Sequence, residues 1–227
     1  MKLAVLGTGM VGQTLAAKLD ALGHDVRLGT RDPAATLART EPGAFGNPSP
    51  AAWAAAHPRI GVVTLADAAA HGEVVVNALA GAATLAGLEQ AGADHLAGKV
   101  LIDVSNPLDF SRGMPPSLSV CNTDSLGEQV QRRFPAARVV KTLNTVNANL
   151  MVDPGALAGG DHTMFVCGDD GDARRQVAGW LREWFGWRDV VELGDITTAR
   201  GPEMFLPLWL RTWGALGTAS FSFKVVR

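Results

Sequence analysis

Residues 1–12 read Met-Lys-Leu-Ala-Val-Leu-Gly-Thr-Gly-Met-Val-Gly, and this stretch decides the fold. Leu3 to Leu6 form a short apolar run, which is typical of a strand buried on both faces of a parallel sheet. A G-x-G-x-x-G pattern follows at once, and residues 13–19 take up helical spacing. A strand, a glycine-rich turn and a helix in this order indicate a dinucleotide-binding unit.

Each glycine of this pattern has a physical role. Gly7 permits the tight turn, Gly9 lets the backbone approach a pyrophosphate, and Gly12 lets the helix pack closely on the strand. The free N–H groups at the helix N-terminus would face the phosphates. The alternative is an ordinary glycine-rich turn in another α/β protein, which the flanking strand and helix disfavour. We therefore expect the whole loop to bind the cofactor: Gly7, Thr8, Gly9, Met10, Val11 and Gly12.

Composition excludes several classes of partner. The chain has 227 residues, enough for one α/β domain or one domain plus a small lobe, and its net charge is −2. Without a basic cluster, neither nucleic acid nor an anionic membrane surface is an expected partner. Cys121 and Cys167 form no C-x-x-C motif, so we predict neither a metal site nor a disulfide framework.

The location and one enzyme family can also be judged from composition. The first strand begins at once, which disfavours a signal peptide. The apolar stretch 205–219 contains Arg211 and is too short to span a bilayer, so we expect a soluble cytoplasmic protein. The chain contains no tyrosine. The Tyr/Lys proton-donor arrangement of short-chain dehydrogenases is therefore excluded.

The choice between NAD and NADP is made just after the second predicted strand, residues 25–29. NAD-binding proteins place an acidic residue there for the ribose 2′-hydroxyl, whereas NADP-binding proteins offer cations and hydroxyls to the 2′-phosphate. This chain has Thr30 and Arg31, and Arg31 carries a permanent charge on a fork suited to phosphate. Asp32 precedes Pro33, as a helix cap would. We favour NADP(H), the alternative being that Arg31 is an ordinary surface residue.

Further strands and helices alternate along the chain. We predict strands at 61–65, 73–81, 99–104, 138–147, 163–167 and 189–193, and helices at 66–71, 83–96, 124–134 and 172–185. Residues 41–58 are predicted to be a surface excursion with a helical turn at 51–56, and residues 108–122 a polar loop. The fold class is therefore α/β, a Rossmann-type doubly wound parallel sheet with helices on both faces and a small C-terminal α/β extension.

Polar residues at the ends of three predicted strands are candidates for the nicotinamide half of the site. The strand at 73–81 should lie beside the first strand, with its carboxyl end over the dinucleotide. The Ser-Asn-Pro turn at 105–107 suits either a ligand-facing loop or a plain Asx-type turn. The expected lining residues are Asn77, Ala78, Leu79, Ser105, Asn106 and Asn144.

The second half of the chain has one plausible boundary, where Gly and Pro accumulate near residues 147–160. We therefore expect an NADP-binding domain over residues 1–147 and a small lobe over 148–227. A proline-interrupted apolar helix at 198–210 should cover a core edge or a subunit interface. Lys141 could donate a proton, but a lysine near the end of a buried strand is more often structural.

Several segments together form a pattern: Gly7–Gly12, Gly29-Thr30-Arg31 and residues 103–107, 139–145, 164–169 and 194–203. In these segments, and over nearly its whole length, the chain resembles a family, the F420-dependent NADP oxidoreductases, which have Gly-Ser-Arg where this chain has Gly29-Thr30-Arg31. It also looks like the cytosolic NADPH-binding domain of the STEAP metalloreductases. It implies a two-lobed homodimer that moves a hydride between NADP(H) and the deazaflavin of coenzyme F420 as co-substrate. Both rings carry their own reactive carbon, so no catalytic side chain is assigned.

Three functions remain open at this stage. The first is an NADP(H)-dependent oxidoreductase acting on F420 or a flavin-like acceptor. The second is an NADPH-dependent reductase of a small imine or carbonyl substrate, which needs a proton donor, and only Lys141, Thr145 and His162 are eligible. The third is a non-catalytic NADPH-sensing module. We prefer the first, because of the resemblance.

Overall fold

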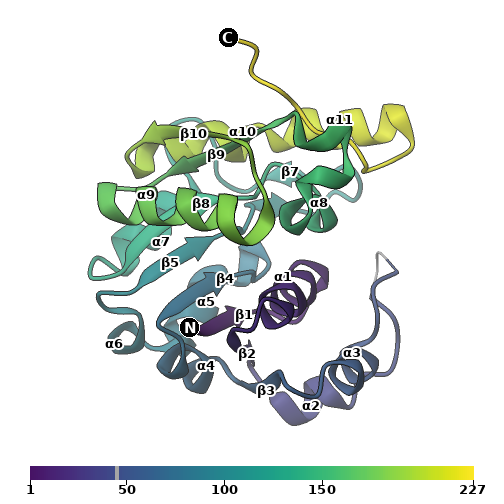
Figure 1. The fold of residues 1–227 in the computed structure, drawn as a ribbon, viewed down its shortest axis with the longest axis vertical. Coiled ribbons are helices and arrows are strands. Elements are labelled where there is room, and N and C mark those ends of the chain that lie inside the picture. The colour runs from purple at the N-terminus through teal and green to yellow at the C-terminus, as the bar shows by residue number, and fades with distance from the viewer. Residues whose placement is uncertain (44–45) are drawn as a thin grey trace.

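The computed structural model describes residues 1–43 and 46–227. One eight-stranded sheet runs through the molecule in the order β10-β9-β8-β5-β4-β1-β2-β3 (Figure 1). Its strands are β1 (Lys2–Leu6), β2 (Asp25–Thr30), β3 (Gly61–Thr64), β4 (Val74–Asn77), β5 (Val100–Asp103), β8 (Arg138–Thr142), β9 (Thr163–Cys167) and β10 (Asp189–Gly194). This order, with β1 between β2 and β4, confirms the predicted Rossmann-type sheet.

Helices cover both faces of the sheet, each over its own apolar core. One core contains residues of α1 (Met10–Ala21), α3 (Pro50–Ala56), α8 (Ala148–Val152) and α9 (Gly171–Trp180). The other contains residues of α4 (Leu65–His71), α5 (Gly81–Ala91), α6 (Ala93–Leu96) and α7 (Leu126–Arg133). The aromatic side chains of Trp180, Trp184 and Phe185 belong to the first core. Many helix starts are set locally by side-chain caps, at Asp32, Ser49, Thr64, Ser125, Asn147 and Asp170.

Several predicted elements need correction. The helix expected over 83–96 is two helices, because Gly92 takes a positive φ of 92° between α5 and α6. The helix expected over 172–185 is α9 followed by a π-helical turn, Leu181–Phe185. The polar loop at 108–122 contains a hairpin of β6 (Leu108–Asp109) and β7 (Ser117–Leu118). Of the expected excursion at 41–58, Ala44 and Phe45 lie outside the described residues.

The far edge of the sheet departs from the expected parallel arrangement. β9 pairs with β8 antiparallel, with Lys141 opposite Cys167 and Thr142 opposite Val166, and β10 is parallel to β9. Since only the last two residues of each strand pair, Thr163–Phe165 continue beyond the carboxyl end of β8. One sheet thus crosses the expected boundary at residue 147, and the division into two lobes stays a prediction.

The C-terminal part packs against this same edge of the molecule (Figure 1). After β10 come short 3-10 turns and helices, η4 (Ile196–Ala199), α10 (Arg200–Met204) and α11 (Leu206–Leu216). The predicted apolar helix is therefore interrupted at Phe205 and ends later than expected. Trp209, Leu210 and Phe221 form a small third core. In the described part of the chain, no helix has the length and apolarity to cross a membrane.

The remaining short elements are α2 (Pro33–Leu37), which follows β2, and the 3-10 turns η1 (Pro154–Ala156) and η2 (Ala158–Gly160), which precede β9. Of these elements, α2 bears on the candidate site, because Arg39, just past its end, reaches Thr8 of the glycine loop.

Candidate functional site

The glycine loop lies where the sheet order reverses, between the carboxyl ends of β2 and β4. Leu6 is paired with Gly29 on one side and with Asn77 on the other. The Gly7 N–H donates to the Gly29 carbonyl at 2.9 Å, and the Ala78 N–H donates to the Leu6 carbonyl at 2.9 Å. In sheets of this kind, ligands bind in the crevice at this position.

The three glycines of the loop serve two different purposes. A Cβ at Gly7 would lie 2.5 Å from the Ala78 carbonyl oxygen, and one at Gly12 would lie 1.9 Å from the Gly7 carbonyl oxygen. Both positions therefore require glycine for packing, and Gly7 also has a φ of 117°. A Cβ at Gly9, by contrast, would meet no atom within 4 Å. The open surface over Gly9 fits the close approach of a pyrophosphate.

The N-terminus of α1 is free to bind an anion. Gly9 caps it without a side chain, and its first turn holds no acidic residue. Thr8 lies before it, and Met10 and Val11 are its first residues, both half-buried. The backbone N–H groups of this turn are left without intrahelical partners, at the positive end of the helix dipole.

At the end of β2, Asp32 directly follows the two residues predicted to hold the 2′-phosphate, Thr30 and Arg31. The Thr30 and Thr36 hydroxyl oxygens lie 2.8 Å apart, which ties α2 to the strand. Arg31 is exposed to solvent. Asp32 caps α2, since its Oδ1 accepts from the Ala35 N–H at 2.9 Å. The acidic side chain at this position is therefore used by the helix.

Arg39 is a candidate binding residue that sequence reasoning missed. It follows the C-terminal end of α2 and is exposed, and its Nη2 donates to Thr8 Oγ1 at 3.1 Å. A second guanidinium thus reaches the glycine loop beside the end of β2. No spacing rule could have indicated it, because its position depends on the short length of α2.

On the opposite side of β1, two predicted lining residues point inward. The Asn77 side chain is fully buried; its Nδ2 donates to Asp103 Oδ1 at 2.7 Å, and its Oδ1 accepts from the Leu79 N–H at 3.3 Å. The Ser105 hydroxyl donates to the same Asp103 oxygen at 2.7 Å. In this conformation these side chains support the loops rather than line the crevice. Ala78 and Leu79, which follow Asn77, are half-buried, and each packs against one of the two apolar cores.

Asn106 and Asn144 join the ends of β5 and β8. Asn106 Nδ2 donates to the Asn144 carbonyl at 3.0 Å, and Asn144 Nδ2 donates to Asn106 Oδ1 at 2.9 Å. Asn144 Nδ2 also donates to the Pro202 carbonyl at 3.0 Å, so the pair contacts α10. Asn144 is buried, whereas Asn106 is half-buried and belongs to the rim.

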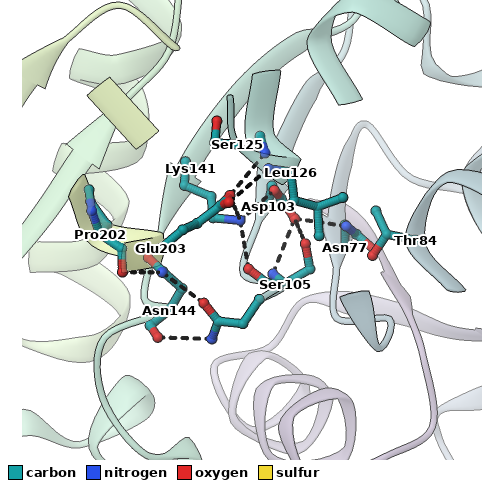
Figure 2. A network of polar contacts seen from close by, with 12 residues as sticks. Asn77, Thr84, Asp103, Ser105, Ser125, Leu126, Lys141, Asn144, Pro202 and Glu203 are labelled. Carbon is teal, nitrogen blue, oxygen red and sulfur yellow. Dashed lines mark hydrogen bonds and ion pairs between the residues drawn. The ribbon is translucent and has the colours of Figure 1, made fainter. Parts of the chain in front are cut away.

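Behind these loops lies a buried ionic network centred on Lys141 (Figure 2). Its ammonium nitrogen lies 2.9 Å from Asp103 Oδ2, 2.6 Å from the Ser105 carbonyl oxygen and 2.8 Å from Glu203 Oε1. All three N–H donors of the ammonium are thereby used. Burial lowers the pKa of Lys141, but the Asp103 and Glu203 carboxylates more than offset this and raise it above its usual value. Lys141 is therefore structural, as the sequence favoured, and a poor proton donor.

The second carboxylate of the network also caps a helix. Glu203 Oε2 accepts from the Leu126 N–H at 2.7 Å, and Oε1 accepts from the Gly127 N–H at 2.9 Å. The three ionised side chains carry a net charge of −1, and the N-terminal dipole of α7 compensates part of it. Beside it, Arg200 pairs with Glu128 at 2.6 Å.

The other eligible proton donors are also internal. His162 is buried, its Nε2 lies 3.0 Å from the Pro154 carbonyl oxygen, and its ring packs edge-on against Trp187. Thr145 is buried too. Cys167 is buried, and burial raises the pKa of its thiol to about 11. Among residues 1–43 and 46–227, no group of His, Cys, Asp or Glu side chains could hold a metal ion.

Comparison with known proteins agrees with this geometry. The family model described as NADP oxidoreductase, coenzyme F420-dependent, matches residues 2–107. The crystal structure of a proposed F420-dependent NADP reductase from Arthrobacter sp. FB24 is 60% identical, covers 100% of both chains and has a TM-score of 0.96. The metalloreductase STEAP3 of Rattus norvegicus is 29% identical over 213 residues, which are 92% of this chain and 38% of the rat protein.

More distant structures share the fold alone. A reductive aminase from Aspergillus terreus, solved in complex with NADPH and ethyl levulinate, is 18% identical and has a TM-score of 0.62 over 95% of this chain and 62% of that one. The closer matches extend over both halves of the sheet, and the family model covers the glycine loop and the end of β2. The chain belongs to the family of coenzyme F420-dependent NADP oxidoreductases.

Proposed function

We propose that the protein is an NADP(H)-dependent oxidoreductase that transfers a hydride between nicotinamide and coenzyme F420 or a flavin-like acceptor. The observation that carries the NADP(H) part is the pairing of an open Gly9 at an uncapped helix N-terminus with exposed Arg31 and Arg39. Asp32, which follows Arg31, is used as a helix cap. The F420 part rests on the family.

The residues of this chain would bind and orient the cofactor rather than react with it. The N–H groups at the start of α1 would hold the pyrophosphate, and Thr30, Arg31 and Arg39 would hold the 2′-phosphate. Ala78, Leu79 and Asn106 would border the nicotinamide ring. When bound, the nicotinamide supplies the hydride. The protein's contribution would be to hold two rings face to face and to exclude water between them.

Among the described residues, none of the three candidate proton donors is free, which supports a partner that can take its proton from solvent. The ammonium of Lys141 has all its donors used, and the pKa of this group is raised above its usual value. His162 and Thr145 are buried. Reduction of an imine or a carbonyl requires a proton at the substrate heteroatom, usually from a positioned donor. A reduced deazaflavin or flavin also takes up a proton, at a ring nitrogen, but this nitrogen can receive it from solvent. The described residues therefore favour a deazaflavin or flavin partner.

We also propose that two copies of the chain assemble as a homodimer in the cytoplasm, as the resemblance implies. Leu208 and Leu216 of α11 are 53% and 58% exposed, which makes this helix the first surface to test. Light scattering during size-exclusion chromatography would measure the mass, and a single-chain mass at micromolar concentration would contradict the dimer.

A cofactor-exchange assay tests the function. Purified protein is mixed with NADPH and oxidised F420, with FMN and ferric citrate in parallel, and both chromophores are followed. Equal loss of NADPH and of the deazaflavin band is expected, and the Gly9→Val variant should show neither. NADPH binding without oxidation by any acceptor would instead favour the small-substrate or sensor function. If NADPH does not bind at all, the proposal fails.

A further inference from the structure

A continuous series of contacts joins the C-terminal helix α10 to the loop that follows β4 (Figure 2). It starts at Glu203, passes to the Lys141 ammonium at 2.8 Å and from there to Asp103 at 2.9 Å. Asp103 accepts from the Asn77 amide at 2.7 Å, and Asn77 accepts from the Leu79 N–H at 3.3 Å. Residues far apart in sequence thereby form one unit at the carboxyl edge of the sheet.

The members of this series have no room for alternative partners. The side chains of Lys141 and Asp103 are 0% exposed and that of Glu203 is 1% exposed. Asp103 Oδ1 alone accepts from the Asn77 amide, the Ser105 N–H and the Ser105 hydroxyl. Loss of the partner of a buried charge strongly destabilises the folded protein. The network therefore holds its backbone attachments in one arrangement.

Those attachments are the loops that border one half of the crevice. Asn77 holds the Leu79 N–H, and the preceding Ala78 packs its carbonyl against Gly7. The Lys141 ammonium holds the Ser105 carbonyl at 2.6 Å. Glu203 itself accepts hydrogen bonds from two N–H groups at the start of α7, so that α10 is attached both to α7 and, through Lys141, to the sheet.

We propose that Glu203 is a positioning residue for the nicotinamide half of the cofactor site, acting through Lys141, Asp103 and Asn77 on the loop at 78–80. This rests on the proposed function, because it assumes that a dinucleotide binds at the glycine loop. The inference adds that α10 supports the cofactor site indirectly, since Glu203 would act through other residues and not by contact with the ligand. The residues proposed for the 2′-phosphate, Thr30, Arg31 and Arg39, lie on the other side of β1, and none of the described contacts joins them to the network.

A second ion pair supplies a matched control. Arg200 also lies on α10 and pairs with Glu128 on α7, at 2.6 Å and 2.9 Å. It thus joins the same two helices as Glu203, but among the described residues it makes no hydrogen bond or ion pair with Lys141, Asp103 or Asn77. A variant at Arg200 weakens the attachment of α10 without altering the loops at the crevice.

The experiment compares two ligands on the same folded variants. NADPH occupies both halves of the site, whereas 2′,5′-ADP occupies only the adenine half. We expect Glu203→Gln to weaken NADPH binding about tenfold and to leave 2′,5′-ADP within about twofold of wild type, as measured by calorimetry. Arg200→Met should leave both affinities within about twofold. The glutamine keeps the size of the side chain but cannot accept from both α7 N–H groups and Lys141 together.

A second variant keeps the inference testable if Glu203→Gln does not fold. Asn77→Ala leaves every ion pair intact and removes the last two contacts of the series, those of Asn77 with Asp103 and with the Leu79 N–H, so it should reproduce the selective loss of NADPH binding. Equal weakening of both ligands, or no weakening, by either folded variant overturns the positioning role. A wild-type protein that binds neither ligand would instead overturn the proposed function.

Discussion

The two halves of the candidate site are built in opposite ways. On the proposed adenine side, the candidate binding groups are backbone N–H groups of a glycine loop and exposed arginines that have no carboxylate partner in the described contacts. On the nicotinamide side, the loops are held by side chains that are fully buried and satisfied. Among the described residues, the proposed adenine half offers unpaired positive groups to a charged ligand. In the nicotinamide half, the charged side chains are paired with one another.

This difference predicts how each half responds to substitution. A change on the adenine side should alter binding and leave folding nearly intact, because the groups involved contact little else. A change in the buried network should alter stability first, and binding as a consequence. The predictions below test this contrast, beginning with the largest expected effect.

Removing the charge of Lys141 should have the largest effect on folding. Lys141→Met leaves two buried carboxylates without their shared cation, so we expect the free energy of unfolding to fall by about 3–5 kcal/mol. Urea denaturation followed by tryptophan fluorescence would measure it. The control is Arg133→Met, which removes an exposed pair with Glu89 and should change stability little. Similar losses for the two variants would contradict the contrast.

Gly9→Val should have the largest effect on binding. The new side chain would occupy the open surface where the pyrophosphate must approach, so we expect affinity for NADPH to fall by at least about 100-fold. Stability should fall by no more than about 1 kcal/mol, since valine is only a poorer helix cap and meets no atom. Titration of NADPH fluorescence and thermal unfolding would measure the two effects. Unchanged titration curves would refute the role of the loop.

Arg31→Ala should separate the two nicotinamide cofactors. Loss of a charge-assisted hydrogen bond to the 2′-phosphate should weaken NADPH binding by about 1–3 kcal/mol and leave NADH binding unchanged. Arg112→Ala, at another exposed arginine, serves as the control. Equal weakening for NADPH and NADH would remove the 2′-phosphate assignment.

The smallest effect concerns alkaline pH. Burial lowers the pKa of Lys141, but the neighbouring carboxylates of Asp103 and Glu203 raise it by more. The pKa of Lys141 in the folded protein therefore lies above the usual 10.5. The contribution of charged Lys141 to the free energy of unfolding is then complete below pH 10.5. It is lost as the pH rises through the pKa of Lys141 in the folded protein, by up to about 1.4 kcal/mol per pH unit. The stability difference between wild type and Lys141→Met should therefore be constant from neutral pH to about 10 and shrink above it. A constant difference up to the alkaline transition would contradict this.

The same contrast explains what could be predicted from the sequence. The glycine loop and Thr30-Arg31 are contiguous in the chain, and their roles follow from spacing and from the strands before them. The sheet, its helices on both faces and most element bounds followed from periodicity in the same way. The packing at Gly7 and Gly12 agrees with the roles predicted for them, and the role of Gly9 at a pyrophosphate stays a prediction.

What could not be predicted depends on contacts across the chain. Asn77 and Ser105 were expected to line the crevice because polar residues end their strands, but Asp103 draws both side chains inward. Glu203 lies 62 residues beyond Lys141 and was recognised only as part of a family pattern. The antiparallel direction of β9 is likewise invisible to periodicity, since a buried strand reads alike in both directions.

The two amide groups that Glu203 holds give the molecule an internal reporter. The first N–H groups of a helix have no intrahelical partner and normally exchange rapidly with solvent deuterium. In this protein, the amides of Leu126 and Gly127 are bonded to a carboxylate 77 and 76 residues further along the chain. Their exchange must await the release of α10, so two amides at the start of α7 record how often the C-terminal helices come away from the sheet.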